Sequence, residues 1–272
     1  SDWFYDEIVQ TGSHHSNTLS ASGGTEIIRY FASGTYRGET GVLPESGERY
    51  GSARLNLDVT PRQDLTIRLN SGFSARRVQV VPDANNTRGY SINGLVGGPN
   101  GQFIPTESTQ LIQSFQNSNR FTGGLTGEYR PLEGFTSRLT FGFEAVTSDQ
   151  HQLFPYGAIA NLINGYRSNY RSAATNVNID FVNTYRTQLT PWLRSTTTVG
   201  FQHFTNIFGA SDAWGNDFVF HGLETIGGTV TRSASESRLE QRSNGLFGEQ
   251  QLAFAERFYI TGGLRGDAHS TF

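Results

Sequence analysis

The 272-residue sequence contains no cysteine, no methionine and no lysine. The absence of cysteine excludes disulfide bonds and thiolate metal ligands. Because all 21 basic residues are arginine, a phosphate-loop lysine, a Schiff-base lysine and a Ser–Lys catalytic pair are also excluded. A sequence without methionine lacks its initiator residue. We therefore expect a processed or truncated chain, and no signal peptide is recognisable.

Long apolar runs are missing as well. Apolar residues make up 35% of the sequence, and no stretch approaches the ~20 consecutive apolar residues that a spanning helix requires. The net charge of -3 offers no basic stripe, so no nucleic-acid partner is expected. Gly-x-Ser-x-Gly, His-Glu-x-x-His and phosphate-loop motifs are absent, and the histidines are scattered. The sequence thus predicts no enzyme, no cofactor and no metal site.

What the sequence does contain is a strict alternation of apolar and polar residues, which is typical of β-strands. Leu55 and Leu57, for example, alternate with Arg54 and Asn56. The alternation predicts an all-β protein of about ten antiparallel strands joined in hairpins, most of them about 10–13 residues long. The predicted pairs are Ser16–Ser22 with Glu26–Arg37, Arg49–Val59 with Leu65–Arg76, two pairs around residues 121–144 and 176–207, and Arg238–Phe254 with Phe258–Asp267.

Short and long breaks between these strands follow one another in turn. Tight turns are predicted at Gly23-Gly24, Pro61, Pro131, Pro191 and Glu256. The wide breaks between them are Gly38–Glu48, Val78–Ser118, Gln150–Ala173 and Gly209–Ser235. In a meander of antiparallel strands, this alternation of short and long connections places all tight turns at one rim and all long loops at the other. Transmembrane β-barrels of the bacterial outer membrane have this asymmetry, with short periplasmic turns and long extracellular loops.

Strand length and aromatic residues also favour a membrane barrel. Soluble strands usually have ~5–6 residues, whereas a tilted strand needs ~9–11 to cross a membrane. Aromatic residues gather near the tight turns, where a barrel has a periplasmic aromatic girdle. They are Tyr129, Phe135, Trp192, Phe254, Phe258 and Tyr259. The alternation by itself also fits a soluble sheet with one face in water, so a secreted β-sheet binding module remains an alternative.

The barrel hypothesis assigns each face of the strands to a different environment. An arginine that faces hydrocarbon near the midplane of a barrel wall costs ~2–4 kcal/mol. We therefore expect the charged residues to face a polar lumen and the apolar residues to face lipid. The expected lumen-facing residues are Arg54, Arg68, Arg138, Asp180 and Arg194. The expected lipid-facing residues are Leu55, Leu57, Leu69, Leu139, Phe141 and Phe181.

Several segments resemble SusC/RagA-like TonB-dependent outer-membrane transporters. The opening Asp2-Trp3-Phe4-Tyr5-Asp6-Glu7-Ile8-Val9-Gln10-Thr11-Gly12 is similar to the entry into the barrel of that family. The similarity continues in His15–Gly24, in Arg29-Tyr30-Phe31 and in Glu48-Arg49-Tyr50, and returns in Arg257–Asp267. It covers the strand segments and leaves out the long loops.

The resemblance implies a 22-stranded barrel filled by an N-terminal plug, with a TonB-contacting segment before the plug. About ten strands fall short of such a barrel. We therefore expect residues 1–272 to be an open, partial barrel domain that lacks the plug and the C-terminal strands.

The resemblance further implies TonB-driven import of a large nutrient, an oligosaccharide or a peptide, through the outer membrane. It implies membrane lipid, TonB and a SusD-like surface lipoprotein as partners. A passive porin-type channel would share the same wall and remains an alternative.

Aromatic residues in the long breaks are the candidates for ligand contact, because binding residues concentrate on loops carried by a rigid scaffold. Their flat, amphipathic rings suit stacking against sugars and other organic ligands. The alternative is a purely structural role, in which these rings pack the loops against one another. The candidates are Tyr156, Tyr166, Tyr170, Trp214, Phe218 and Phe220.

Overall fold

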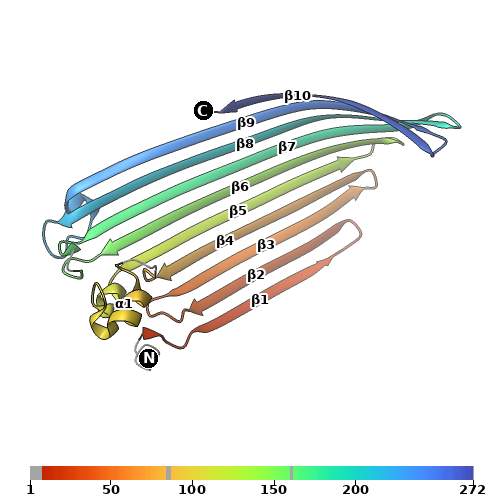
Figure 1. Ribbon diagram of the computed structural model, residues 1–272. Coiled ribbons are helices and arrows are strands. Elements are labelled where there is room, and N and C mark those ends of the chain that lie inside the picture. The colour runs from red at the N-terminus through yellow and green to blue at the C-terminus, as the bar shows by residue number, and fades with distance from the viewer. Residues whose placement is uncertain (1–7, 84–86, 160–161, 272) are drawn as a thin grey trace.

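The computed structural model describes residues 8–83, 87–159 and 162–271. These residues form one ten-stranded antiparallel sheet whose strands lie side by side in chain order (Figure 1). The predicted number of strands and their hairpin order are confirmed, and residues Asp2–Glu7 of the opening motif lie outside the described residues. The strands are β1 Ser13–Gly24, β2 Ile28–Thr40, β3 Gly47–Arg62, β4 Leu65–Val80, β5 Gln113–Tyr129, β6 Phe135–Phe154, β7 Tyr166–Thr190, β8 Leu193–Phe218, β9 Thr229–Phe254 and β10 Phe258–Thr271.

The connections alternate between the two ends of the sheet as predicted. Every strand pairs antiparallel with its neighbours in sequence. Consequently the turns that contain or adjoin Pro61, Pro131 and Pro191 share one end, and the long connections share the other (Figure 1). We call these the turn end and the loop end.

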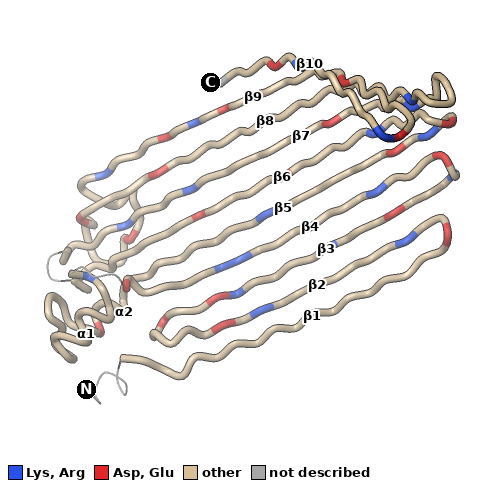
Figure 2. The backbone as a smooth tube through the Cα atoms, turned by 45° about the vertical axis from the view of Figure 1, so that its right-hand side comes forward, with Lys and Arg blue, Asp and Glu red and all other residues tan. Residues whose placement is uncertain are grey.

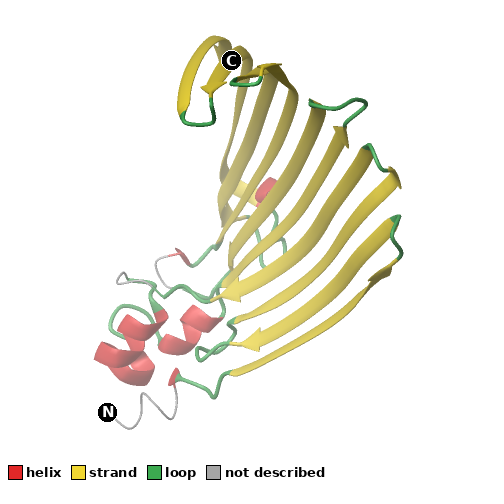
Figure 3. Ribbon diagram, turned by 90° about the vertical axis from the view of Figure 1, so that its right-hand side faces the viewer, coloured by secondary structure: helices red, strands yellow, loops and turns green. Residues whose placement is uncertain are grey.

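The sheet is open within the described residues. Its order runs from β1 to β10, and these two strands are its edges rather than partners (Figure 3). An unpaired edge leaves backbone donors and acceptors unsatisfied, and hydrocarbon cannot satisfy them. The arrangement confirms the predicted open antiparallel sheet.

The strands are longer than predicted. They range from 12 residues in β1 to 26 residues in β8 and β9, whereas the alternation indicated about 10–13. The difference lies at the loop end, where polar residues occupy both faces and the apolar–polar alternation disappears. The backbone ladder nevertheless continues there, since Phe218 of β8 still pairs with Thr229 of β9.

Two short helices lie in the connection between β4 and β5 and were not predicted from the sequence. Helix α1 spans Tyr90–Gly97, helix α2 spans Thr106–Gln110, and the 3-10 turn η2 spans Gly98–Asn100. None of the helices in the described residues is long and apolar enough to cross a membrane. We refer to residues 87–112 as the helical insert; it lies at the loop end of the sheet (Figure 3).

Candidate functional site: a two-faced wall and its mouth

The register sorts the predicted lipid-facing and lumen-facing residues onto two opposite faces. Residues opposite each other in an antiparallel ladder point to the same side. On one face Leu57 is opposite Leu69, and Leu139 is opposite Phe181. All six residues predicted to face lipid lie on this apolar face. All five residues predicted to face the lumen, including Arg138, lie on the other, polar face.

Aromatic side chains border the apolar face at the turn end. Tyr129, Phe135 and Phe258 are on this face, and Tyr129 is also contacted by the Arg62 guanidinium, 5.7 Å from its ring centroid. Trp192 in the turn between β7 and β8 stacks on the Phe254 ring at 6.1 Å. Such a row at one rim is typical of the interfacial girdle of a membrane barrel. Of the six predicted girdle residues, Tyr259 differs, because its register places it on the polar face.

The loop-end border of the apolar residues runs diagonally across the strands. On β4 the apolar residues extend up to Phe73. Following the cross-strand partners of Phe73 from one strand to the next leads to Glu240 on β9. On β9 the apolar residues already give way after Leu246 to Asn244 and Arg242. Leu246 is six residues nearer the turn end than Glu240, so the border shifts by about one residue per strand. Strands tilted by ~40° and spaced ~4.8 Å apart give this shift. If the strands are tilted by ~40°, as in a membrane barrel, the border of the apolar band runs parallel to the membrane plane.

Ion pairs and hydrogen bonds connect neighbouring strands across the polar face, and charged residues occur on every strand from β2 to β10 (Figure 2). Glu128 on β5 is 5% exposed and is held by Arg130 and by Arg138, whose Nη2 lies 2.9 Å from its carboxylate. Closer to the loop end, Glu48 on β3 pairs with both Arg37 and Arg76. Each of these two carboxylates is shared by two guanidinium groups.

Two further chains of polar side chains run across the strands of the polar face. In the first, Arg120 pairs with Glu144, Asn176 donates to Glu144 at 3.0 Å, and Asn206 donates to Asn176. This chain joins β5, β6, β7 and β8. In the second, Arg265 on β10 donates to Gln202 on β8 at 2.6 Å, and Gln202 donates to Asp180 on β7 at 3.0 Å. Gly245 on β9 leaves room for the Arg265 side chain to cross β9, since a Cβ at position 245 would lie 2.5 Å from the Arg265 guanidinium.

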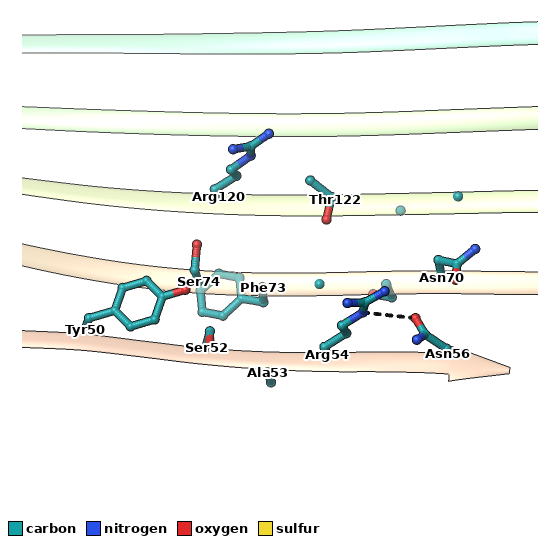
Figure 4. Close-up of a pocket in the computed structure, with 14 residues that line it drawn as sticks. Tyr50, Ser52, Ala53, Arg54, Asn56, Asn70, Phe73, Ser74, Arg120 and Thr122 are labelled. Carbon is teal, nitrogen blue, oxygen red and sulfur yellow. Dashed lines mark hydrogen bonds between the residues drawn. The ribbon is translucent and has the colours of Figure 1, made fainter. Parts of the chain in front are cut away.

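A shallow groove of about 580 Å³ lies on the polar face over β3, β4 and β5 (Figure 4). Arg54 is one of its lining residues and donates to Asn56 at 3.3 Å. Gly72 in its floor carries no side chain. The other polar residues that line the groove are Tyr50, Ser52, Asn70, Ser71, Ser74, Arg120 and Thr122. The wall thus offers a hydrated surface of arginines, amides and hydroxyls.

The helical insert covers the polar face at the loop end. Phe154 on β6 and Tyr166 on β7 are on the polar face. They pack with Ile104 and Ile112 of the insert and with Ile159 of the loop between β6 and β7 in one buried cluster. The insert therefore lies over the polar face at the loop end of the sheet, and we call this region the mouth.

Asn93 holds the helical insert together. Its side chain is 0% exposed. The amide nitrogen donates to the carbonyl oxygens of Thr87 and Gly89, and the amide oxygen accepts from the backbone N–H groups of Phe103 and Ile104. One side chain thereby satisfies four backbone groups that lie before and after helix α1.

Tyr90 is also buried in the insert, where it packs with Ile8 and Val81. Burial raises the pKa of the Tyr90 phenol, and the hydrogen bond that its oxygen accepts from Gln110 partly opposes this. The phenol is therefore neutral at ordinary pH and serves packing.

A pocket of about 420 Å³ lies in the mouth on the polar side. The rings of Tyr166 and Trp214 stack within it at 6.5 Å, with 26° between their planes. Phe154 meets Tyr166 edge to face at 5.6 Å, and the Arg88 guanidinium lies 5.0 Å from the centroid of the Phe154 ring. Among the described residues, the pocket is lined by Arg88, Gln152, Leu162, Tyr166, Trp214, Asn216 and Thr231.

The structure corrects the positions of four of the six aromatic ligand candidates. Tyr166, Tyr170, Trp214 and Phe218 lie on strands and not in loops, because the hairpins continue past the apolar band. Phe218 is in addition only 3% exposed. It packs tightly over Gly165, where a Cβ would lie 2.5 Å from the Phe218 ring. Phe218 therefore packs against neighbouring residues, as the alternative to ligand contact predicted.

Tyr156 and Phe220 are in loops as predicted. Tyr156 meets His221 edge to face at 6.0 Å, and Phe220 is exposed. The structure brings only Tyr166 and Trp214 together in one pocket. Arg88 was missed, because no pattern in the sequence relates residue 88 to positions 166 and 214.

Comparison with known proteins supports the interpretation of the wall. No family model matches the chain. Its sequence is 23% identical to TonB-dependent receptor P3 and 24% identical to TonB-dependent receptor P26, both from Formosa agariphila, over the whole of this chain. The chain is thus similar to a part of each of these two TonB-dependent receptors. It spans 30% of the first relative and 29% of the second.

Solved structures agree with this barrel segment. The structure of the RagAB peptide transporter matches with a TM-score of 0.79 at 16% identity, over 99% of this chain and 33% of that chain. The ferric citrate transporter FecA matches with a TM-score of 0.60 at 9% identity, over 98% of this chain and 36% of that chain. These similarities confirm the predicted fold class and resemblance and support the outer-membrane location. The relatives and the solved structures are named receptors and transporters.

Proposed function

We propose that this barrel segment belongs to a TonB-dependent transporter that imports a large, polar nutrient through the outer membrane. The polar face lines the lumen, with Arg54, Arg68, Arg138, Asp180 and Arg194 directed inward, and the apolar face meets lipid. An oligosaccharide or a peptide is the proposed cargo. Both are too large for passive diffusion and both carry the hydrogen-bonding groups that such a wall accommodates.

The observation that carries this proposal is the contrast between the two faces of one sheet. Large apolar side chains stay exposed on one face, and cross-strand ion pairs occupy the other. A secreted binding module would have no reason to leave Leu139 and Phe181 uncovered in a tilted band, since exposed apolar patches of this kind favour aggregation in water. The contrast supports a membrane wall over a soluble module.

The remaining parts of the transporter are proposals that follow from the relatives. Residues 1–272 form part of the barrel domain, and a plug fills the lumen of the complete protein. TonB engages the N-terminal side of the plug and supplies the force for import. A SusD-like surface lipoprotein covers the mouth.

Energy dependence separates this proposal from a passive porin. We expect cells that express the full-length protein to take up labelled oligosaccharide or peptide, and we expect this uptake to stop when the inner-membrane proton gradient is dissipated. A porin needs no energy source, so uptake that survives dissipation of the gradient, or deletion of tonB, would contradict the proposal.

A further inference from the structure

We infer that Arg49 and Arg77 bind a phosphate group of a lipid headgroup in the outer leaflet of the membrane. Both arginines lie on the same side of the sheet as the apolar face, nearer the loop end than the apolar residues. The inference rests on the proposed function, which places the loop end outside the cell. It goes beyond that function by assigning a lipid headgroup to one place on the outer side of the wall.

The register brings the two arginines together. Arg49 on β3 is directly opposite Arg77 on β4, and both side chains are exposed. Arg49 alternates in phase with Leu55, and Arg77 alternates in phase with Leu69, so both point to the apolar side. Like charges directly opposite each other destabilise an antiparallel pair. An anion that contacts both guanidinium groups would remove this repulsion.

No carboxylate fills this role within the described residues, because neither Arg49 nor Arg77 takes part in an ion pair there. The Arg77 guanidinium lies over the Phe115 ring, 4.9 Å from its centroid. The other arginines on this side of the described strands each have a carboxylate or a backbone carbonyl as acceptor. They are Arg171 with Asp149, Arg238 and Arg242 with Glu240, Arg167 with the carbonyl of Glu224, and Arg232 with the carbonyl of Gly227.

The residues beside the pair along the same cross-strand row are not acidic. Gly38 on β2 is opposite Arg49, His15 on β1 is opposite Gly38, and Asn117 on β5 is opposite Arg77. The His15 imidazole lies over Gly38, since a Cβ at position 38 would collide with that ring. The imidazole and the amide can each donate a hydrogen bond to an oxyanion. The row thus surrounds the two guanidinium groups with further donors.

A groove of about 630 Å³ lies at the two arginines and extends to the loop between β2 and β3. Three glutamates are among the residues that line it, namely Glu39, Glu45 and Glu48. Glu48 is bound by two arginines of the polar face, and Glu39 is opposite Glu48 on that face. Glu45 accepts a hydrogen bond from Gln79, which is nearer the loop end than Arg77. The part of the groove nearest the apolar band therefore keeps its positive charge.

The height of the pair fits a lipid headgroup. Arg77 is four residues nearer the loop end than Phe73, where the large apolar residues on this side of β4 end. Four residues of a strand tilted by ~40° rise ~10 Å along the membrane normal. The headgroup layer lies directly outside the hydrocarbon core, and an arginine reaches back to it along its flexible stem. Guanidinium groups pair with phosphate through two parallel N–H groups. A lipid whose acyl chains lie on the apolar face can therefore place its phosphate between Arg49 and Arg77.

The test measures lipid binding to the purified full-length protein in detergent by native mass spectrometry. The probes are diphosphoryl lipid A, the same lipid A after removal of its phosphates, and inorganic phosphate. We expect the phosphorylated lipid to bind about 30-fold more tightly than the dephosphorylated one. Inorganic phosphate should not displace it, because the free ion lacks the acyl chains that contact the apolar face. Equal binding of the two lipids, or displacement by an equimolar amount of inorganic phosphate, would overturn the inference.

Variants locate the site at the two arginines. Arg49→Gln and Arg77→Gln should each weaken binding of the phosphorylated lipid about fivefold, and the double variant about 30-fold. The double variant Arg49→Lys, Arg77→Lys should retain most of the binding, because an ammonium group also attracts phosphate. Arg76→Gln is the matched control, since it makes the same charge change on the same strand but on the polar face. It should bind the lipid like the wild type, and an equal loss in this variant would overturn the inference.

Uptake measurements keep this inference separate from the proposed function. Energy-dependent uptake by a protein that does not prefer the phosphorylated lipid would overturn the lipid site alone. Preference for the phosphorylated lipid without energy-dependent uptake would reject the import function and leave the lipid site intact.

Discussion

Leu139→Arg in the full-length protein is expected to block assembly into the outer membrane. Leu139 is 44% exposed on the apolar face of β6, with Phe181 opposite it on β7. An arginine there would face hydrocarbon at a cost of ~2–4 kcal/mol near the midplane of a barrel wall. The amount of heat-modifiable, folded protein in the membrane fraction measures the effect.

Arg138→Gln is the matched control for this substitution, because it changes the adjacent residue of the same strand. The side chain of Arg138 is on the polar face, and its partner Glu128 keeps its second ion pair with Arg130. We expect near-normal assembly of this variant. Equal loss of membrane-inserted protein in both variants would argue against an apolar face that meets lipid.

Asn93→Ala is expected to unfold the helical insert while the wall stays assembled. The substitution leaves four backbone groups of the insert without the partner that Asn93 provides. An unsatisfied buried polar group costs ~1–3 kcal/mol, so the loss exceeds what two short helices can tolerate. On intact cells, an external protease should cut the variant within residues 87–112 much faster than the wild type, and the folded barrel should persist.

Asn100→Ala tests whether this effect depends on the buried site. Asn100 lies in the same insert and is exposed, so its variant should resist protease like the wild type. Similar cleavage of the Asn93 and Asn100 variants would mean that Asn93 does not hold the insert. Loss of the whole barrel in the Asn93 variant would mean that the insert is not an independent unit.

The sequence predicted the wall because a membrane imposes strict alternation on a strand. Wherever one face meets an apolar band, a pattern such as Leu55, Leu57 and Val59 against Arg54 and Asn56 follows directly. The order of the strands was also predictable, since each tight turn forces its two strands to be antiparallel neighbours. For these reasons the two faces and both ends of the sheet agree with the prediction.

The loop end was not predictable, because the strands there extend past the apolar band and polar residues occupy both of their faces. The ladder of β8 and β9 continues through Trp214 and Ser233, yet no alternation marks this part of the sequence. The helical insert depends on the tertiary contacts of Asn93 and Tyr90 rather than on helix propensity. The pocket joins residues 88, 166 and 214, which only the three-dimensional arrangement of three connections brings together.

Thiol labelling of single cysteines tests the central claim most directly, namely that one face of this sheet meets lipid and the other a hydrated lumen. The described segment has no cysteine of its own, so each introduced thiol is unique within it. Cysteine is placed in turn at positions 138 to 141 of β6 and at positions 179 to 182 of β7 in the full-length protein. We expect a water-soluble thiol reagent to label the positions of Arg138, Thr140 and Asp180 and to spare those of Leu139, Phe141 and Phe181. Uniform labelling along both strands, or labelling of the apolar positions alone, would contradict the account.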